Sequence, residues 1–400
     1  MFPAFLARTA AGLFAAAILA ATPALAQNFN GNSPNGADQK PAFANQTRAP
    51  VINDTVRLKT TVVAEGLVNP WGLAELPDGR WLVTERPGRM RLVGTDGKLS
   101  DPIKGLPPVH AQGQGGLLDV AVKDDFAQTR RVWWSFAEPR GEAGNASAVA
   151  TGTLSPDGSA LTDVRVIFQQ NPAWRSNLHY GSRLVFDRTG ALFVTTGERS
   201  QPEPRVLAQD VRTHLGKVLR ISPDGGAAPG NPAIPGGQPE IWSYGHRNLQ
   251  AAALAPDGSL WTVEHGPRGG DELNRPEAGR NYGWPVITYG LEYSGRPVGA
   301  GATAREGMEQ PVYFWDPVIG PSGMAFYDGA MFPQWRGSAL IGGLAAPSLV
   351  RLTIENGRVT GEARYLRNLG RIRDVAVARD GAIMLITDES SGKLIRVTPE

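Results

Sequence analysis

The segment from Ser243 to Pro285 combines side chains that bind ligands with glycines that leave the backbone accessible. It holds a cation beside an amide at Arg247-Asn248, a short apolar stretch at Leu260–Val263, and a glycine-rich acidic run from Gly266 to Glu272. Polar loops held by a rigid scaffold carry most of the binding and catalytic chemistry of proteins. The composition therefore predicts that this segment contributes to a ligand site.

A histidine outside this segment could serve as a general base. His179 is one of five histidines and stands directly before the apolar stretch that begins near Arg183. A neutral imidazole can accept a proton because its ordinary pKa is about 6.5. The competing interpretation is a structural histidine that bonds a loop carbonyl, and position alone favours it.

Two sets of arginines could hold anionic oxygens. Arg247 precedes an apolar stretch, and Arg371-Ile372-Arg373 precedes another. In an extended chain, Arg371 and Arg373 project to the same face because side chains alternate. Guanidinium groups suit carboxylate and quinone oxygens. Alternatively, these residues could be ordinary solvated arginines on the surface. The occurrence of two such sets at equivalent places in separate repeats argues against that interpretation.

Oxygen donors suited to a hard cation lie in the same region. Gly266-Pro267 can present backbone carbonyls, and Asp271, Glu272 and the region of Tyr282 add further oxygens. Such oxygens suit Ca²⁺. The pattern could also be an ordinary acidic turn. The sequence has no His-Glu-x-x-His zinc pattern, no strand-to-helix dinucleotide fingerprint, no nucleophile elbow and no cysteine.

The elements that must position these residues repeat along the chain. A small apolar strand, a turn of the Pro-Asp-Gly kind, a second apolar strand and a polar loop recur, with units beginning near residues 70, 115, 182, 250, 321 and 372. Repeats of this size with several strands each are typical of a β-propeller. We therefore predict an all-β fold with six blades, rather than a sandwich or a β-helix. The polar loops of a propeller gather at one end of its channel, so distant residues can share one site.

The N-terminal residues look like an export signal. Arg8 precedes an apolar run from Gly12 to Ala21, and Ala24-Leu25-Ala26 has the small-x-small pattern of a cleavage site. The run is too short for a spanning helix, so a lipid anchor is the weaker alternative. We predict a signal peptide over 1–26, a flexible lead-in over 27–55 and the propeller over 56–400. The expected product is periplasmic or secreted, without membrane insertion. The full chain has a formal net charge of +2, which falls to +1 without Arg8, and this near-neutral balance gives no reason to expect nucleic acid.

Over about residues 55 to 400 the chain resembles the glucose/sorbosone dehydrogenase family of quinoproteins. The matching segments are Gln114–Leu118, His179–Leu184, Tyr244–Asn248, Glu264–Glu272, Asn281–Pro285, Arg371–Asp374 and Thr387–Gly392. The resemblance implies a six-bladed propeller that uses pyrroloquinoline quinone (PQQ) and Ca²⁺.

The resemblance also assigns roles to individual residues. His179 matches the family's base. Positions that contact the quinone are matched by Gln114, Arg247, Asn248, Tyr293, Gly343, Leu344, Ala345, Arg371 and Arg373. Gly266 and Pro267 match carbonyl donors to the calcium beneath the cofactor, and Glu272 and Tyr282 match a second calcium site.

Two positions depart from the family pattern. Ala345 stands where the family usually has a lysine beside the quinone, and Leu178 stands where the glucose dehydrogenase branch has an aspartate before the base. The first change removes a positive charge from the cofactor pocket. The second leaves the group that orients His179 unidentified.

The implied activity is oxidation of an aldose at its anomeric carbon to a lactone, with electrons passed to an acceptor outside the cytoplasm. Two other functions remain open. Calcium-dependent propeller lactonases hydrolyse their substrates, although arginine pairs suit an anionic cofactor better. The second alternative is a propeller that only binds its ligand. The strongest support for it is Ala345, which stands where the family usually has a lysine.

Overall fold

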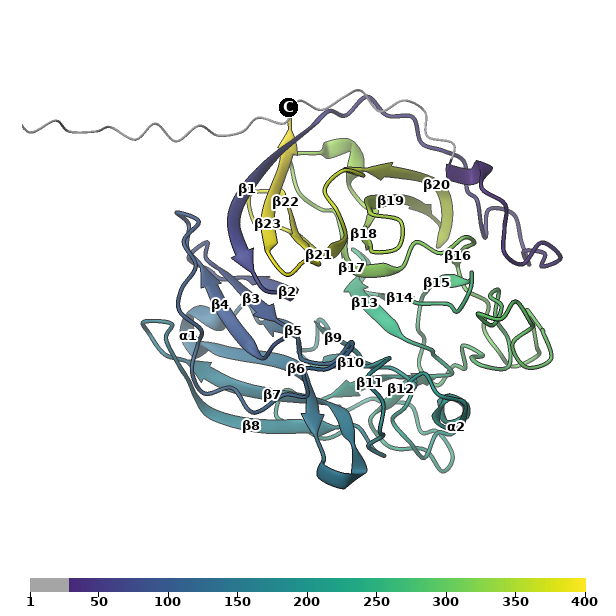
Figure 1. Ribbon diagram of the computed structural model, residues 1–400, viewed down its shortest axis with the longest axis horizontal. Coiled ribbons are helices and arrows are strands. Elements are labelled where there is room, and N and C mark those ends of the chain that lie inside the picture. Colours follow the sequence, from purple (N-terminus) through teal and green to yellow (C-terminus); the bar gives the residue numbers. More distant parts are fainter. Residues whose placement is uncertain (1–28) are drawn as a thin grey trace, which may run out of the picture.

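A computed structural model describes residues 29–400, and the predicted signal peptide lies outside these residues. Six antiparallel sheets surround one central axis, as Figure 1 shows. The inner strands begin at Pro70, Leu117, Gly181, Leu249, Pro321 and Ile372, close to the six predicted repeat starts. The prediction of a six-bladed propeller is therefore confirmed.

The blades follow one another along the chain. The first contains β2 (Pro70–Glu75), β3 (Trp81–Glu85) and β4 (Arg89–Val93), and the second contains β5 (Leu117–Val122), β6 (Arg131–Pro139), β7 (Asn145–Leu154) and β8 (Leu161–Gln169). The third contains β9 (Gly181–Phe186), β10 (Leu192–Thr196), β11 (Lys217–Ile221) and β12 (Ile241–Tyr244). The fourth contains β13 (Leu249–Leu254), β14 (Leu260–Glu264), β15 (Asp271–Asn274) and β16 (Tyr313–Trp315).

The fifth blade contains β17 (Pro321–Phe326), β18 (Ala339–Gly343), β19 (Ser348–Glu355) and β20 (Arg358–Tyr365). The sixth contains β21 (Ile372–Val377), β22 (Ile383–Thr387) and β23 (Gly392–Pro399), and β1 (Leu58–Leu67) completes it by pairing with β23. The ring is thus closed by strands from both ends of the chain. The helical turns are short: α1 (Phe126–Thr129), α2 (Pro202–Arg205), η1 (Phe29–Gly31), η2 (Gly141–Ala143), η3 (Val206–Ala208) and η4 (Pro333–Trp335).

The core is a ring of apolar layers between neighbouring blades. Because side chains alternate between the two faces of a strand, each strand contributes residues to two apolar layers. On β6, Trp134 packs toward the first blade and Trp133 toward the third. On β3, Leu82 faces the second blade and Val83 the sixth. Each sheet is therefore apolar on both faces, which explains why the repeats contain so few polar strand residues.

Antiparallel pairing sets the position of the site. The start of each inner strand pairs with the end of the second strand, as in Gly181 with Thr196, Leu249 with Glu264 and Ile372 with Thr387. The loops before the inner strands and after the second strands consequently meet at one mouth of the channel. Every inner strand has a register irregularity near this end, and such irregularities re-aim side chains.

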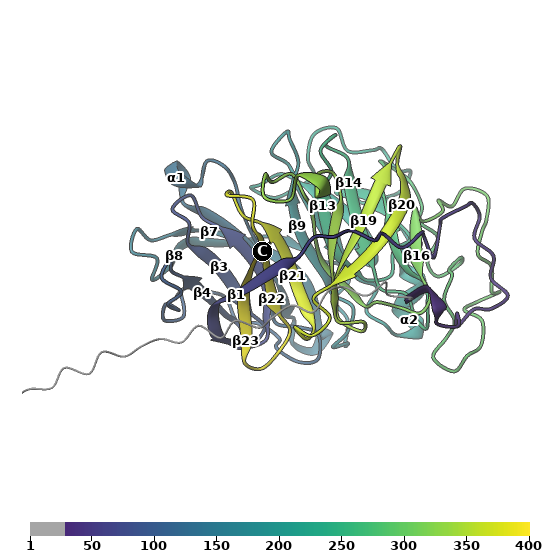
Figure 2. The same cartoon turned by 90° about the horizontal axis from the view of Figure 1, so that it is seen from above.

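Residues 29–55 pack against the outside of the fourth and fifth blades, as the purple segment in Figure 2 shows. Gln46 and Ala49 are buried. The amide of Gln46 donates to Pro311 O at 3.0 Å, and Ile52 N donates to Glu362 O at 2.8 Å. This packing differs from the flexible lead-in predicted by composition. Residues 29–55 lack hydrophobic periodicity, and the burial of Ala49 and long-range hydrogen bonds hold them in place instead.

Asp54 ties the segment to the fifth blade, because its Oδ2 accepts hydrogen bonds from Trp335, Arg351 and Tyr365. Asp54→Ala would leave the buried Arg351 without its carboxylate. We expect the free energy of unfolding to fall by about 2–3 kcal/mol. Chemical denaturation should detect the change, and Asp78→Ala, which removes a more exposed ion pair with Arg80, should alter stability much less. Equal effects of the two substitutions would contradict a bracing role for Asp54.

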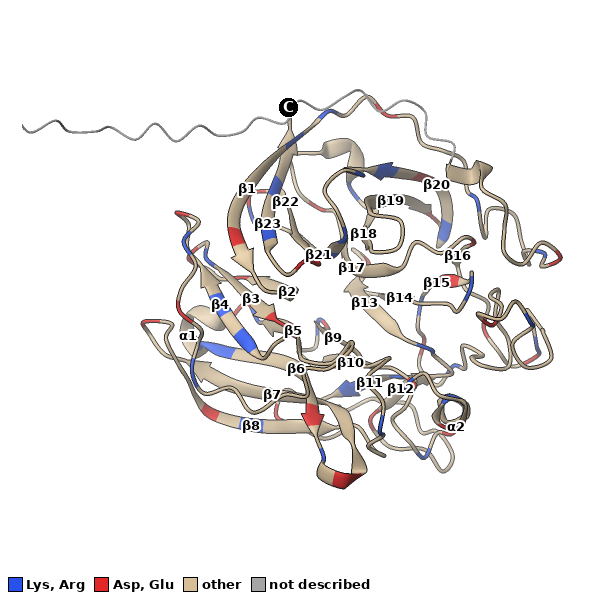
Figure 3. Cartoon of the chain, in the orientation of Figure 1, with Lys and Arg blue, Asp and Glu red and all other residues tan. Residues whose placement is uncertain are grey.

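Basic and acidic residues are interspersed around the blades (Figure 3). Across residues 29–400, no helix is both long enough and apolar enough to cross a membrane.

Candidate active site

A cavity of about 210 Å³ opens at the mouth of the channel, and every blade contributes to its wall. Four residues that the sequence assigns to the cofactor line it, namely Gln114, Leu344, Arg371 and Arg373. The remaining wall comes from Trp71, Arg86, Leu118, Tyr180, Gly181, Gln250, His265 and Asp388. The propeller thus brings residues more than 250 positions apart into one pocket.

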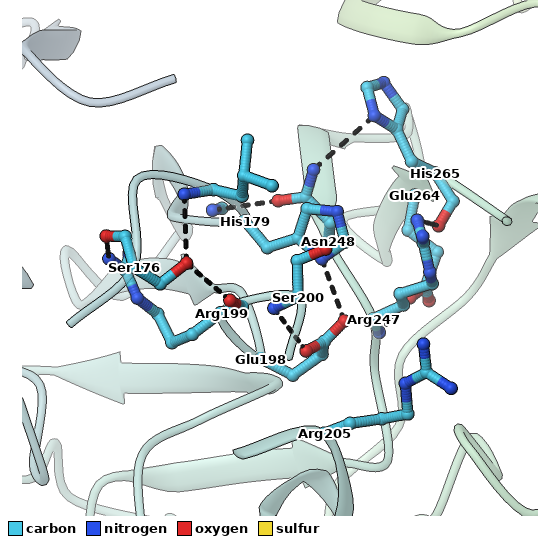
Figure 4. Close-up of polar contacts among 12 residues, drawn as sticks. Ser176, His179, Glu198, Arg199, Ser200, Arg205, Arg247, Asn248, Glu264 and His265 are labelled. Carbon is cyan, nitrogen blue, oxygen red and sulfur yellow. Dashed lines mark hydrogen bonds and ion pairs between the residues drawn. The ribbon is translucent and has the colours of Figure 1, made fainter. Parts of the chain in front are cut away.

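His179 lies at the edge of this cavity, directly before the lining residues Tyr180 and Gly181. Its side chain is buried, and its Nδ1 lies 2.8 Å from Glu198 Oε1 (Figure 4). Glu198 stands in the loop after β10 and receives a second hydrogen bond from Ser200 N at 2.7 Å. This carboxylate orients His179, a role that the sequence left unassigned because Leu178 precedes the histidine.

The electrostatics of the pair keep the imidazole neutral. Burial lowers the pKa of His179 to about 4, and the charge of Arg247 acts in the same direction. Burial alone would raise the pKa of Glu198, but the contacts with His179 and Arg247 lower it, so Glu198 is a carboxylate. A carboxylate only accepts hydrogen bonds, so His179 must donate through Nδ1. Its Nε2 then carries the free lone pair that a general base needs.

The backbone around His179 is held by two neighbouring loops. Gln114 Oε1 accepts a hydrogen bond from His179 N at 2.8 Å, and Asn248 Oδ1 accepts one from Gly181 N at 3.2 Å. His179 has a positive φ of 48°, which is uncommon for a side chain other than glycine and persists only where surrounding contacts fix it. Gln114 and Asn248, both predicted as cofactor contacts, therefore position the backbone around His179.

Arg247 is buried beside the same loop. Its Nη1 donates to His265 O at 2.9 Å and to Gly266 O at 2.8 Å. Its guanidinium carbon lies 5.1 Å from the ring centroid of Trp284, and Arg205 contacts the same ring at 5.3 Å. The ring of Trp284 therefore supports Arg247, which gives one residue of the Asn281–Pro285 segment a structural role.

Arg371 and Arg373 share one carboxylate. Asp388 Oδ2 accepts hydrogen bonds from Arg371 Nη2 at 2.8 Å and from Arg373 Nη2 at 2.9 Å. The two guanidinium groups therefore lie on one face, as the alternation of an extended chain predicts. Arg371 Nη1 also donates to Leu344 O at 3.1 Å, which links the sixth blade to the fifth.

Gly266 and Pro267, the predicted calcium donors, are buried in the tight turn after β14. A Cβ on Gly266 would lie 2.3 Å from Gly269 O, so only glycine fits there. Asp271 Oδ1 fixes the turn by accepting a hydrogen bond from Gly266 N at 2.8 Å. In residues 29–400, no three acidic or imidazole side chains converge on a possible metal position, so a calcium ion here would depend on backbone carbonyls.

The predicted second calcium site lies apart from the cavity lining. Asn274 Nδ2 donates to Glu264 Oε1 at 3.0 Å and to Glu272 Oε2 at 3.1 Å. Burial, and then the charge of Glu264, raise the pKa of Glu272 well above its ordinary value. Tyr282 reaches this cluster only through His246, on which its ring stacks at 4.8 Å. Its hydroxyl donates to Arg275 O instead.

Two further predicted cofactor contacts have unexpected positions. Tyr293 is 73% exposed and lies in a separate surface hollow with Arg205 and Glu292, outside the cavity lining. Ala345 is exposed beside the buried Gly343 and Leu344, and its N–H donates to Ile319 O at 2.9 Å. The loop therefore reaches the cavity through Leu344 alone.

Three charged residues of the site were absent from the predicted set, namely Glu198, Asp388 and Arg86. The repeats could have predicted these residues, because each lies just after the second strand of its blade. In the fourth blade, Glu264, the last residue of β14, holds His246 Nδ1 at 2.9 Å, much as Glu198 holds His179. The position of a residue within its blade could thus have identified Glu198.

Comparison with known proteins places the chain among sugar dehydrogenases. Residues 67–396 match the glucose/sorbosone dehydrogenase family. The aldose sugar dehydrogenase YliI of Escherichia coli (strain K12) is 44% identical over 344 residues, which cover 84% of this chain and 92% of that protein. A crystal structure of a glucose dehydrogenase is 48% identical with a TM-score of 0.82, covering 85% of this chain and 99% of that one. The PQQ-bound aldose sugar dehydrogenase of Streptomyces coelicolor is 29% identical with a TM-score of 0.68, covering 86% and 99%.

Proposed function

The chain belongs to the glucose/sorbosone dehydrogenase family, and on that premise we propose that it oxidises aldose sugars at the anomeric carbon to lactones, with PQQ and Ca²⁺ as cofactors. The observation that carries the proposal is a neutral, carboxylate-oriented His179 beside a cavity walled by arginines. A base and cationic side chains are the groups that such an oxidation requires.

The residues of the cavity fit an anionic quinone. The Nε atoms of Arg247 and Arg373 are buried and have no hydrogen-bond acceptor among residues 29–400. Buried guanidinium N–H groups without acceptors are costly unless a ligand supplies oxygens. PQQ carries carboxylate and carbonyl oxygens, so Gln114, Arg247, Asn248, Arg371 and Arg373 would hold it.

The carbonyls of Gly266 and Pro267 are hard oxygen donors of the kind that Ca²⁺ takes. A carbonyl oxygen has two lone pairs, so Gly266 O can serve a cation while it accepts a hydrogen bond from Arg247. The paired carboxylates of Glu264 and Glu272, with the buried Oδ1 of Asn274 left without a donor in the described residues, fit a second cation. We assign Tyr282 to the surroundings of that second site, and Tyr293 to the loop beside the mouth.

The chain's own residues prepare the substrate for oxidation. His179 Nε2 takes the proton of the anomeric hydroxyl, and Glu198 stabilises the imidazolium that forms. Arg247 would stabilise negative charge that develops on oxygen during the reaction. When bound, PQQ would supply the hydride acceptor, and Ca²⁺ held by the carbonyls of Gly266 and Pro267 would supply Lewis-acid polarisation. We propose that the reaction takes place outside the cytoplasm, with an extracytoplasmic electron acceptor, because the sequence of residues 1–26 predicts an export signal.

Reconstitution tests the proposal against the two alternatives. We expect the purified mature protein to reduce an artificial dye with aldoses only after PQQ and Ca²⁺ are added, and to lose this activity on chelation of Ca²⁺. Lactone hydrolysis without PQQ would instead identify a calcium-dependent propeller hydrolase. Sugar binding with neither activity would identify a non-catalytic binding propeller.

A further inference from the structure

Arg86 is a cationic residue of the cavity that the resemblance assigns to no role. It directly follows β3 in the first blade, and its backbone is fixed on both sides. Arg86 N donates to Asn69 O at 3.1 Å, and Leu117 N donates to Arg86 O at 3.2 Å. A Cβ on Gly116 would lie 2.1 Å from Arg86 O, so the glycine pair at 115–116 permits this close approach.

The guanidinium group of Arg86 is held in place but is not neutralised. Its Nη1 donates to Gly113 O at 2.6 Å, next to the cavity residue Gln114. Its Nε is buried without an acceptor in the part of the chain that the structure describes. The preceding Glu85 pairs with Arg89 at 2.7 Å rather than with Arg86. Arg86 forms no ion pair with any carboxylate in residues 29–400.

The cavity therefore carries more positive than negative side chains. Among residues 29–400, the cavity is lined by Arg86, Arg371 and Arg373 and by a single carboxylate, Asp388, which the two other arginines share. Arg86 and Arg373 line the same cavity, and burial together with the charges of Arg183 and Arg86 lowers the pKa of Arg373 against the opposing effect of Asp388. An anion between these groups would relieve the repulsion.

We propose that Arg86 binds a carboxylate group of the quinone cofactor from the first blade, on the wall formed with Trp71 and Gln114. A guanidinium fork matches a carboxylate in shape and charge. The pocket would thus keep three cationic side chains although Ala345 supplies none. This assignment rests on the proposed function, because it requires PQQ in the cavity.

Equilibrium titration of the full mature chain with PQQ in the presence of Ca²⁺ tests the assignment through the dissociation constant rather than through activity. Arg86→Met should weaken PQQ binding by about 10- to 100-fold, as expected for loss of a charge-assisted contact. Arg86→Lys, which keeps the charge without the fork, should weaken it less. Arg91→Met on the neighbouring strand β4, outside the cavity, is the matched control and should bind as the unchanged chain does.

A PQQ derivative with esterified carboxylates separates a direct contact from a general disturbance. Arg86→Met should alter binding of the ester by less than about twofold, because the coupling between a pair of groups disappears when either is removed. Equal weakening for PQQ and its ester, or unchanged PQQ binding by both Arg86 variants, would overturn the assignment and leave the proposed function intact. Failure of the unchanged chain to bind PQQ would overturn both. Thermal unfolding of the cofactor-free proteins checks that the variants fold.

Discussion

His179→Ala should reduce the turnover number for aldose oxidation by at least about 10³-fold, because the group proposed to accept the hydroxyl proton would be missing. Gln114, Arg371 and Arg373 are unaffected by this change, so we expect PQQ to bind with nearly unchanged affinity. Dye reduction by the reconstituted protein measures turnover, and titration with PQQ measures binding.

His110→Ala is the matched control for that experiment. His110 is a half-buried histidine of the same mouth, and its Nε2 contacts Asn177 Oδ1 at 2.8 Å. It should leave turnover close to that of the unchanged protein. If His179→Ala reduced the dye at the normal rate, His179 would have no part in the mechanism. Loss of PQQ binding in His179→Ala would instead indicate a structural role.

Glu198→Gln should lower the turnover number by about 10- to 100-fold, because a neutral amide neither fixes the Nδ1–H tautomer nor stabilises the imidazolium as a carboxylate does. The substitution keeps the shape of the side chain and its contact with Ser200 N. The Michaelis constant should change little if Glu198 acts through His179 rather than on the sugar.

The pH dependence distinguishes this role from a loss of folding. His179 works as a base only when neutral, so the rate should fall as the pH drops toward its pKa of about 4. Glu198 raises that pKa through its hydrogen bond and its charge, against the lowering by burial. Its removal should therefore move the acid limb of the profile to lower pH. Glu142→Gln, on an exposed turn, should leave both rate and profile unchanged; an identical acid limb in Glu198→Gln would contradict the pairing.

The β-propeller and its blade boundaries were predictable from sequence because each blade repeats the same local rules. Short apolar strands separated by Asp-Gly turns specify hairpins, and six such units are too many for one sheet. The positions of Arg371 and Arg373 on one face followed from strand alternation. These features depend on neighbours along the chain.

The partners of those residues were not predictable in the same way. Glu198 lies 19 residues from His179, and Asp388 lies 17 residues from Arg371, each across a strand pair. The packing of residues 29–55 depends on contacts with residues more than 250 positions away. The exposure of Tyr293 is likewise a property of loop placement, for which the sequence contains no periodic signal.

The sequence by itself determined the architecture, the family and the identity of the base candidate. The repeats specify the architecture, and short residue motifs specify the family and the base candidate. Only the tertiary structure decided that His179 is oriented by Glu198, that Asp388 holds two arginines, and that Arg86 faces the same cavity. The physical reason is that antiparallel pairing brings the loops of every blade to one mouth. Which side chains then meet depends on the ring of blades as a whole.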